Sequence, residues 1–166
     1  MPVKIILKDD CRKLPIEFLY EGPNVHVVYP ALKELIADIL IVPPENIHEK
    51  SFSLSRSGNS EKIKTTFEAI RQLDNFTYMF FEVSANIEKK PSEQFESEGK
   101  VFVKIKGKLI TELPQETIWQ RSFIFQFIWA AAYHFWYRRQ REKYLEECKE
   151  LMFRLEKSLK KLLRVE

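Results

Sequence analysis

The feature that most constrains the fold is a series of four segments in which apolar and polar residues alternate, followed by a tract without glycine or proline. The four segments span residues 48–55, 62–73, 76–88 and 100–111, and turn-forming residues separate them. Alternation with a period of two is typical of strands with one buried face. Short turns between such strands favour antiparallel neighbours. The pattern therefore predicts a four-stranded antiparallel meander.

Two strands and one shorter helix are predicted before the meander. Residues 3–8 and 16–20 are short apolar segments on either side of a polar stretch, which is typical of strands. Residues 25–41 contain apolar residues at the i, i+3, i+4, i+7 spacing of one buried helix face. Pro43 and Pro44 follow this segment and are expected to end the helix.

A long C-terminal helix is predicted after the meander. Pro114 suits the first turn of a helix, and no glycine or proline interrupts residues 115–166. A helix of this length would extend about 75 Å at ~1.5 Å per residue, more than one domain covers. We therefore expect residues 138–166 either to bend or to protrude as an extension of this helix.

Together these elements predict an α+β fold in which residues 1–166 form a single domain. An antiparallel sheet of about 5–6 strands is expected to pack against the long C-terminal helix. The length of the chain suits one domain with a sizeable core. The abundance of Lys, Glu and Ile, together with few glycines, is typical of thermophile proteins.

The most apolar part of the chain is residues 118–137, IWQRSFIFQFIWAAAYHFWY. Its uncharged part, residues 122–137, has 16 residues and includes Gln126 and His134. A membrane-spanning helix usually needs ~20 predominantly apolar residues, so a span is not expected. A helix that is apolar all round must be covered all round. Since a sheet covers one side only, the other side requires the shorter helix, a second subunit, an apolar ligand or a lipid surface.

The order of the elements resembles the helix-grip arrangement of START and polyketide-cyclase-like domains. The resemblance lies in KIKTTFEAIRQLDNFTYMFFEVSANIE, in KVFVKIKGKLIT and in the helix after Pro114. In that family a curved antiparallel sheet wraps a long C-terminal helix around an apolar cavity. The resemblance implies binding of an apolar molecule. Some members of the family are enzymes, but their catalytic residues differ, so the resemblance assigns none here.

The first functional hypothesis is a non-catalytic domain that binds an apolar small molecule or lipid between the sheet and the C-terminal helix. It rests on apolar surface on both sides of these elements, more than one small sheet can cover. The candidate lining consists of aromatic residues from the third meander strand and the C-terminal helix: Tyr78, Phe80, Phe123, Phe127, Trp129 and Tyr133.

The alternative hypothesis is an interaction protein that uses its aromatic and basic C-terminal helix. This helix would form a homodimer, bind a partner protein or lie on an anionic membrane surface. From Pro114 onward the chain holds 11 Lys+Arg against 7 Asp+Glu, which concentrates its net charge of +3 there. The candidate residues for an anionic surface are Arg138, Arg139, Arg141 and Lys143.

Several classes of function are disfavoured by missing motifs. The four glycines form neither GxGxxG nor GxxxxGK, and GxSxG and HExxH are absent as well. His26, His48 and His134 are isolated, so we predict no metal site, no cofactor and no catalytic residue. An enzyme in a helix-grip cavity is the third hypothesis. Nucleic-acid binding is not expected, since the net charge is small and the aromatic residues beside the arginines lie mostly on buried sectors.

The two cysteines, Cys11 and Cys148, are far apart in sequence and belong to no CxxC motif. This pattern favours two reduced, structural thiols, with a single disulfide as the alternative. The apolar run in MPVKIILKDD is too short for a signal peptide. We therefore expect a cytoplasmic location.

Overall fold

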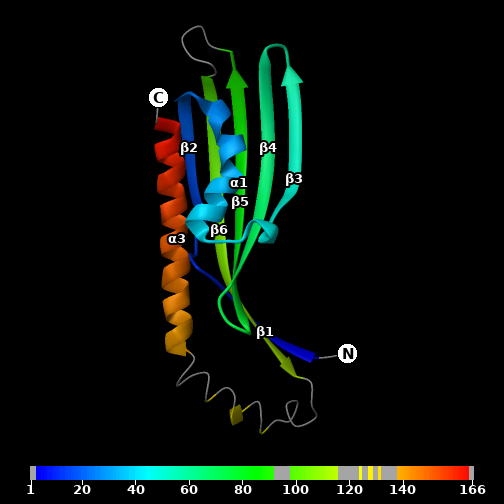
Figure 1. Cartoon of the computed structure of the whole chain (residues 1–166), viewed down its shortest axis with the longest axis vertical. Coiled ribbons are helices and arrows are strands. Elements are labelled where there is room, and N and C mark those ends of the chain that lie inside the picture. The colour runs from blue at the N-terminus through cyan, green and yellow to red at the C-terminus, as the bar shows by residue number, and fades with distance from the viewer. Residues whose placement is uncertain are drawn as a thin grey trace.

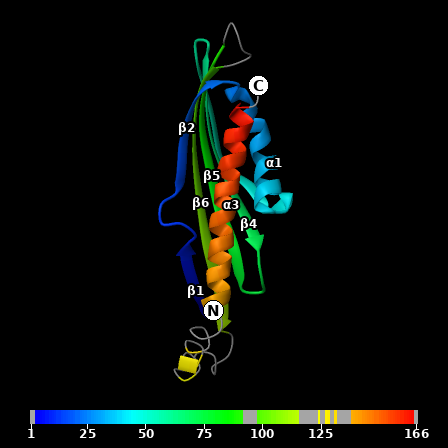
Figure 2. The same cartoon turned by 90° about the vertical axis from the view of Figure 1, so that its left-hand side faces the viewer.

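The computed structural model of this chain describes residues 3–91, 98–115, 124, 127, 128, 131 and 138–164. Within these residues, one six-stranded antiparallel sheet carries two helices, α1 and α3, side by side on the same face (Figures 1 and 2). The predicted α+β fold is confirmed. The elements in chain order are β1 (Val3–Asp10), β2 (Ile16–Pro23), η1 (Val25–Val27), α1 (Val28–Leu40), η2 (Pro44–Asn46), β3 (Ile47–Ser57), β4 (Ser60–Gln72), β5 (Thr77–Lys90), β6 (Glu98–Gln115) and α3 (Arg138–Arg164).

The sheet is built around the predicted meander, since β3, β4, β5 and β6 pair with one another in sequence order. The other edge of β6 is shared by two strands. β1 pairs with the second half of β6, from Val3 opposite Gln115 to Asp10 opposite Lys108. β2 pairs with the first half, starting with Ile16 opposite Ile105. β1 and β2 therefore act as one interrupted edge strand.

The expected helix start at Pro114 is wrong, because β6 continues to Gln115. Pro114 pairs with Lys4 of β1 and lies at the penultimate position of the strand. A proline near the end of a strand removes few ladder hydrogen bonds, and β1 supplies a partner that favours the extended conformation. The predicted continuity of the helix between residues 116 and 137 lies largely outside the described residues.

The core lies between the sheet and the two helices. Apolar residues of β5 and β6 alternate as predicted, so that Met79, Phe81, Val83, Val103 and Ile105 are all buried on the helix-covered face. The sequence left open whether residues 138–166 protrude, and Arg138–Arg164 packs along the sheet as α3 (Figure 2). Its buried stripe follows helical spacing: Cys148, Leu151, Met152, Leu155, Leu159 and Leu163.

A disulfide joins the interrupted edge of the sheet to α3. The backbone N–H of Cys11 donates to the carbonyl of Gly107, 2.9 Å away, at the break between β1 and β2. α3 crosses the sheet there, so that Cys148 lies 5.8 Å from Cys11 between Cα atoms, and the two are bonded. The expectation of two reduced thiols is therefore wrong, and the cytoplasmic prediction loses the support that those thiols gave it.

Candidate functional site

The predicted aromatic lining does not come together in the described part of the chain. Tyr78 and Phe80 alternate with Met79 and Phe81, whose side chains are buried beneath the helices. By the period of a strand, Tyr78 and Phe80 therefore lie on the face of the sheet away from α1 and α3. Phe127 is 69% exposed. The remaining candidates, Phe123, Trp129 and Tyr133, lie outside the described residues.

The space between the sheet and the helices is occupied by side chains. Leu32, Ile36 and Leu40 of α1 are fully buried, as are Met152 and Leu155 of α3. All belong to one apolar cluster with the inner faces of β5 and β6. Such dense packing is what stabilises a folded core.

Three exposed apolar residues lie on one side of a helix in the described part of the chain. Ile124, Phe127 and Ile128 are helical and are 60%, 69% and 54% exposed. Their i, i+3, i+4 spacing places them on one side of a helix, and Ala131 continues that side. We call Ile124, Phe127 and Ile128 the apolar face. Sequence reasoning included Phe127 but missed the two isoleucines, although their spacing identifies them.

The predicted basic cluster is only partly on the surface. Arg138, Arg139 and Lys143 are exposed in the first turns of α3. The Nε of Arg138 lies 3.2 Å from a carboxylate oxygen of Glu142, an exposed i, i+4 ion pair. Arg139 and Lys143 are also spaced i, i+4 and lie together on the adjacent side of α3. We call Arg138, Arg139 and Lys143 the cationic face.

The prediction that Arg141 belongs to this surface is wrong, because the residue is only 3% exposed. Its guanidinium donates to the carboxylate of Asp9 in β1. It also donates to the carbonyls of Leu7 and Leu109, at 3.2 and 3.1 Å. Arg141 therefore fastens the start of α3 to β1 and β6, since a buried guanidinium needs such partners.

The face of the sheet away from the helices is dominated by cross-strand charge pairs. The distances between the ammonium and carboxylate atoms are 3.4 Å for Lys104 and Glu17, 3.5 Å for Lys100 and Glu21, and 3.6 Å for Lys62 and Glu88. Pairs of this kind stabilise adjacent strands modestly. Because each pair joins one positive and one negative side chain, they add no net charge to this face of the sheet.

Tyr78 lies on this same face and interacts with Glu112 of β6. Its hydroxyl donates to a Glu112 carboxylate oxygen at 3.3 Å. Burial raises the pKa of Tyr78 above 10.0, and the negative charge of Glu112 and the hydrogen bond to it raise it further. Tyr78 therefore keeps its proton in the neutral range, where the phenol acts as a hydrogen-bond donor.

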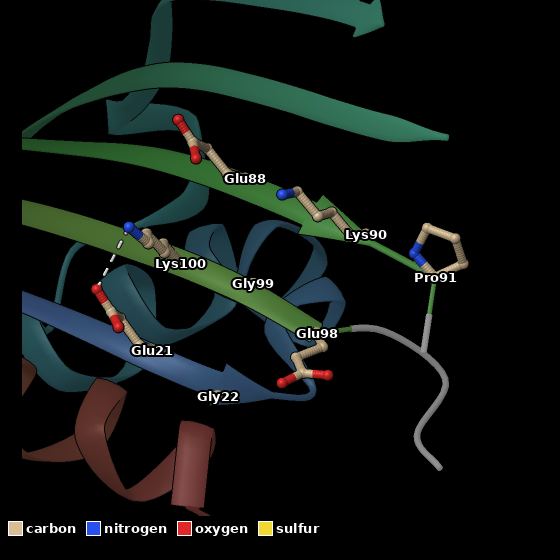
Figure 3. Close-up of a pocket in the computed structure, with 8 residues that line it drawn as sticks. All are labelled: Glu21, Gly22, Glu88, Lys90, Pro91, Glu98, Gly99 and Lys100. Carbon is tan, nitrogen blue, oxygen red and sulfur yellow. Dashed lines mark ion pairs between the residues drawn. The ribbon is translucent and has the colours of Figure 1, made fainter. Parts of the chain in front are cut away.

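A shallow pocket of about 450 Å³ lies where β2 and β5 end and β6 begins (Figure 3). Two of its lining residues, Gly99 and Glu88, lie so close that a Cβ on Gly99 would overlap the carbonyl oxygen of Glu88. Charges of both signs surround it, and the Lys100–Glu21 pair crosses its wall. The lining residues are Glu21, Gly22, Glu88, Lys90, Pro91, Glu98, Gly99 and Lys100.

Two structural features are absent from the described residues. They contain no cluster of three or more His, Cys, Asp or Glu side chains arranged to hold a metal ion. In the same part of the chain, none of the helices combines the length and the hydropathy that crossing a bilayer requires.

Comparison with known proteins finds no matching family model and no matching curated protein. Among solved structures, a delta-endotoxin is 13% identical, with a TM-score of 0.36 over 66% of this chain and 63% of that chain. The activated Cyt2Ba monomer from Bacillus thuringiensis subsp. israelensis is 11% identical, with a TM-score of 0.35 over 64% of this chain and 73% of that chain. The chain thus spans less than two thirds of the delta-endotoxin, and likenesses this low assign it to no family.

Proposed function

We propose that this chain is a non-catalytic interaction protein that docks on an anionic membrane surface. The observation that carries the proposal is the apolar face, in which Ile124, Phe127 and Ile128 are each more than half exposed. Exposed apolar side chains on one side of a helix are typical of interaction surfaces. When cations lie close by in the chain, this composition is typical of helices that lie in a membrane interface.

The charge of the surrounding sequence favours an anionic surface as the partner. No Asp or Glu occurs between Glu116 and Glu142, whereas Arg138 and Arg139 lie within this stretch. Lys143 follows directly, and all three residues of the cationic face are exposed. Juxtamembrane cations are attracted by the negative potential of anionic lipids. A protein partner would need a matching acidic surface around an apolar patch, which is a more specific requirement.

The expected affinity is modest. Transfer of three half-exposed apolar side chains out of water contributes roughly 3–5 kcal/mol. Each exposed cation adds about 1 kcal/mol near an anionic surface. These contributions are opposed by the loss of rotational and translational freedom on docking. Reversible association that weakens at high salt is therefore expected.

Vesicle flotation tests the apolar face. We expect the wild-type protein to float with vesicles of phosphatidylcholine and phosphatidylserine, and much less with phosphatidylcholine alone. Phe127→Glu should abolish flotation, because a carboxylate would replace the most exposed side chain of the apolar face. Phe76→Glu is the matched control, since Phe76 is an exposed phenylalanine in the turn before β5. The proposal fails if wild type ignores anionic vesicles or if Phe127→Glu floats like wild type.

A charge-reversal pair tests the cationic face. The double variant Arg139→Glu, Lys143→Glu should bind anionic vesicles at least about tenfold more weakly, since two attractive charges become repulsive. Lys157→Glu, Lys161→Glu is the control, because both residues are exposed on α3 with the same i, i+4 spacing. Equal losses in both variants would indicate a general charge effect and would contradict a defined cationic face.

Binding of an apolar molecule between the sheet and the C-terminal helix stays a prediction. The filled core in the described residues gives it less support than the exposed apolar face gives membrane docking. Native mass spectrometry of protein purified without detergent tests it directly. An added mass typical of a lipid would favour the ligand hypothesis, whereas a bare protein would not.

A further inference from the structure

β3 is an edge strand with little protection against pairing. It pairs with β4 on one side, and it lies at the end of the strand order in the described sheet (Figure 1). Every residue of β3 after Ile47 is exposed. Edge strands usually carry charges, prolines or bulges that prevent them from pairing with another chain. β3 has a register shift between Glu49 and Ser51, beside the charged Lys50, and beyond it Arg56 is the one charged residue.

The straight part of β3, Ser51 to Ser57, is suited to strand pairing. Its sequence is SFSLSRS, with one charged residue and neither glycine nor proline. Arg56 is that charged residue, and its Nε lies 3.1 Å from a carboxylate oxygen of Glu61. On the helix side of the sheet, Phe52 and Leu54 remain 48% and 45% exposed. Phe52 is held by the ring of Tyr29 from α1, with 5.3 Å between centroids.

The backbone groups of β3 that do not pair with β4 belong to the same residues as the exposed apolar side chains. A two-residue turn joins β3 to β4, with Ser57 opposite Ser60. In such a hairpin the hydrogen-bonded pairs start at the turn and then fall on alternate residues. Ser57, Ser55 and Ser53 thus bond to β4. The N–H and C=O groups of Phe52 and Leu54 point away from the sheet.

We infer that β3 pairs with β3 of a second copy of this chain, antiparallel, about a two-fold axis at Leu54. This register uses the whole straight part and leaves the bulge outside the contact. Leu54 then lies opposite its own copy, and Ser53 lies opposite Ser55. Phe52 lies opposite Arg56 of the other copy, which allows a cation–π contact.

Charge and side-chain pattern favour a second copy over another partner. No two like charges oppose each other in this register, because Arg56 faces a phenylalanine and the four serines face one another. The apolar residues form one central group on the helix side. A strand of different sequence would need the same alternation of serine and apolar residues to fit as well.

Sedimentation velocity without lipid tests the inference. Wild-type protein should show a dimer whose fraction rises across the micromolar range. Leu54→Lys should weaken dimerisation by roughly tenfold or more, because two ammonium groups would meet at the axis. Leu19→Lys, at an exposed leucine of β2, is the matched control and should behave as wild type. Phe127→Glu should also leave the dimer intact, which separates this contact from the proposed membrane surface.

Amide hydrogen exchange on the wild-type protein provides a readout that needs no variant. The amides of Phe52 and Leu54 should become protected as the protein concentration rises, because their N–H groups gain partners only in the dimer. The inference is overturned if wild type stays monomeric throughout this range. It is equally overturned if a dimer forms without concentration-dependent protection of these two amides.

Discussion

Gly107 of β6 lies directly beneath Met152 of α3, so that a Cβ atom on Gly107 would approach the Met152 Sδ to 2.7 Å. The same Cβ atom would lie 3.1 Å from the Sγ of Cys148. Contacts this short force neighbouring atoms to move. Glycine at this position therefore allows α3 to approach the sheet at the break between β1 and β2.

Replacing Gly107 by alanine should destabilise the fold. We expect Gly107→Ala to lower the free energy of unfolding by about 1–3 kcal/mol, because the added methyl group overpacks the contact with Met152. Urea denaturation followed by circular dichroism measures the loss. Gly58→Asn is the control, since Gly58 has a φ of +61° and no atom within 4 Å of its added Cβ. Asparagine tolerates this left-handed conformation, so a loss in the control as large as in Gly107→Ala would argue against the overpacking account.

The Cys11–Cys148 disulfide should stabilise the chain substantially. It joins residues 137 positions apart, and closing so long a loop in the unfolded chain accounts for up to about 5 kcal/mol in the chain-entropy description. A reductant should lower the Tm of wild type but leave Cys11→Ala, Cys148→Ala unchanged. Alkylation under denaturing, non-reducing conditions followed by mass spectrometry checks the bond itself. Two alkylated cysteines in the unreduced protein would contradict it.

Asp9, which pairs with Arg141, should contribute more to stability than Asp10, the next residue of β1. Asp9→Ala leaves the buried guanidinium without its carboxylate, and we expect a loss of about 1–3 kcal/mol in unfolding free energy. Asp10→Ala should change stability by less than ~0.5 kcal/mol, because Asp10 is exposed on the opposite side of β1. Thermal denaturation of the two variants gives the comparison, and equal effects would rule out a specific role for Asp9.

Two tyrosines should make the fold sensitive to alkali. Burial raises the pKa of Tyr29, and the hydrogen bond to Glu49 and the charge of Glu49 raise it further above 10.0. The pKa of Tyr78 is also raised, first by burial and then by the charge of Glu112 and the hydrogen bond to it. A raised folded-state pKa means that the folded chain holds the proton more tightly than the unfolded chain. This stability is fully present below pH ~10 and is lost as the pH rises through the folded-state pKa values.

Stability measured by urea denaturation should therefore fall above pH ~10, and it should fall less steeply in Tyr29→Phe, Tyr78→Phe. Glu112→Gln provides a second check. It removes the charge beside Tyr78, so ultraviolet titration should show this phenol ionising at a lower pH than in wild type. An unchanged titration would show that Glu112 has no influence on Tyr78.

Local pattern predicted the elements and their buried faces well. Alternation along residues 76–88 predicted a strand there, and the structure shows that strand with Met79, Phe81 and Val83 of one face in the core. In α3, Cys148 and Leu155 belong to a buried stripe that follows helical spacing. These features follow from periodicities of two and 3.6 residues, which can be recognised within a single strand or helix segment.

The candidate sites were predicted less well, because they depend on which faces are covered. The aromatic character of Tyr78 and Phe80 is visible in the sequence and suggested that they line a site. Both helices lie on the other face of the sheet, however, and this placement keeps the two residues out of the core. Phe52 and Leu54 attracted no functional hypothesis, since their exposure results from the position of β3 at the edge. A side chain's neighbours across a sheet are not encoded in its own segment.

The sequence by itself determined the α+β class, the order of strands and helices, and the alternation that gives each strand two distinct faces. Only the tertiary structure decided that β1 and β2 share one edge of β6 and that β6 runs through Pro114. It likewise decided that Arg141 is buried and that Cys11 meets Cys148. The first group of features rests on local periodicity, which neighbouring residues set. The second rests on contacts between residues more than a hundred positions apart or on opposite strands, which form only when the sheet and α3 assemble.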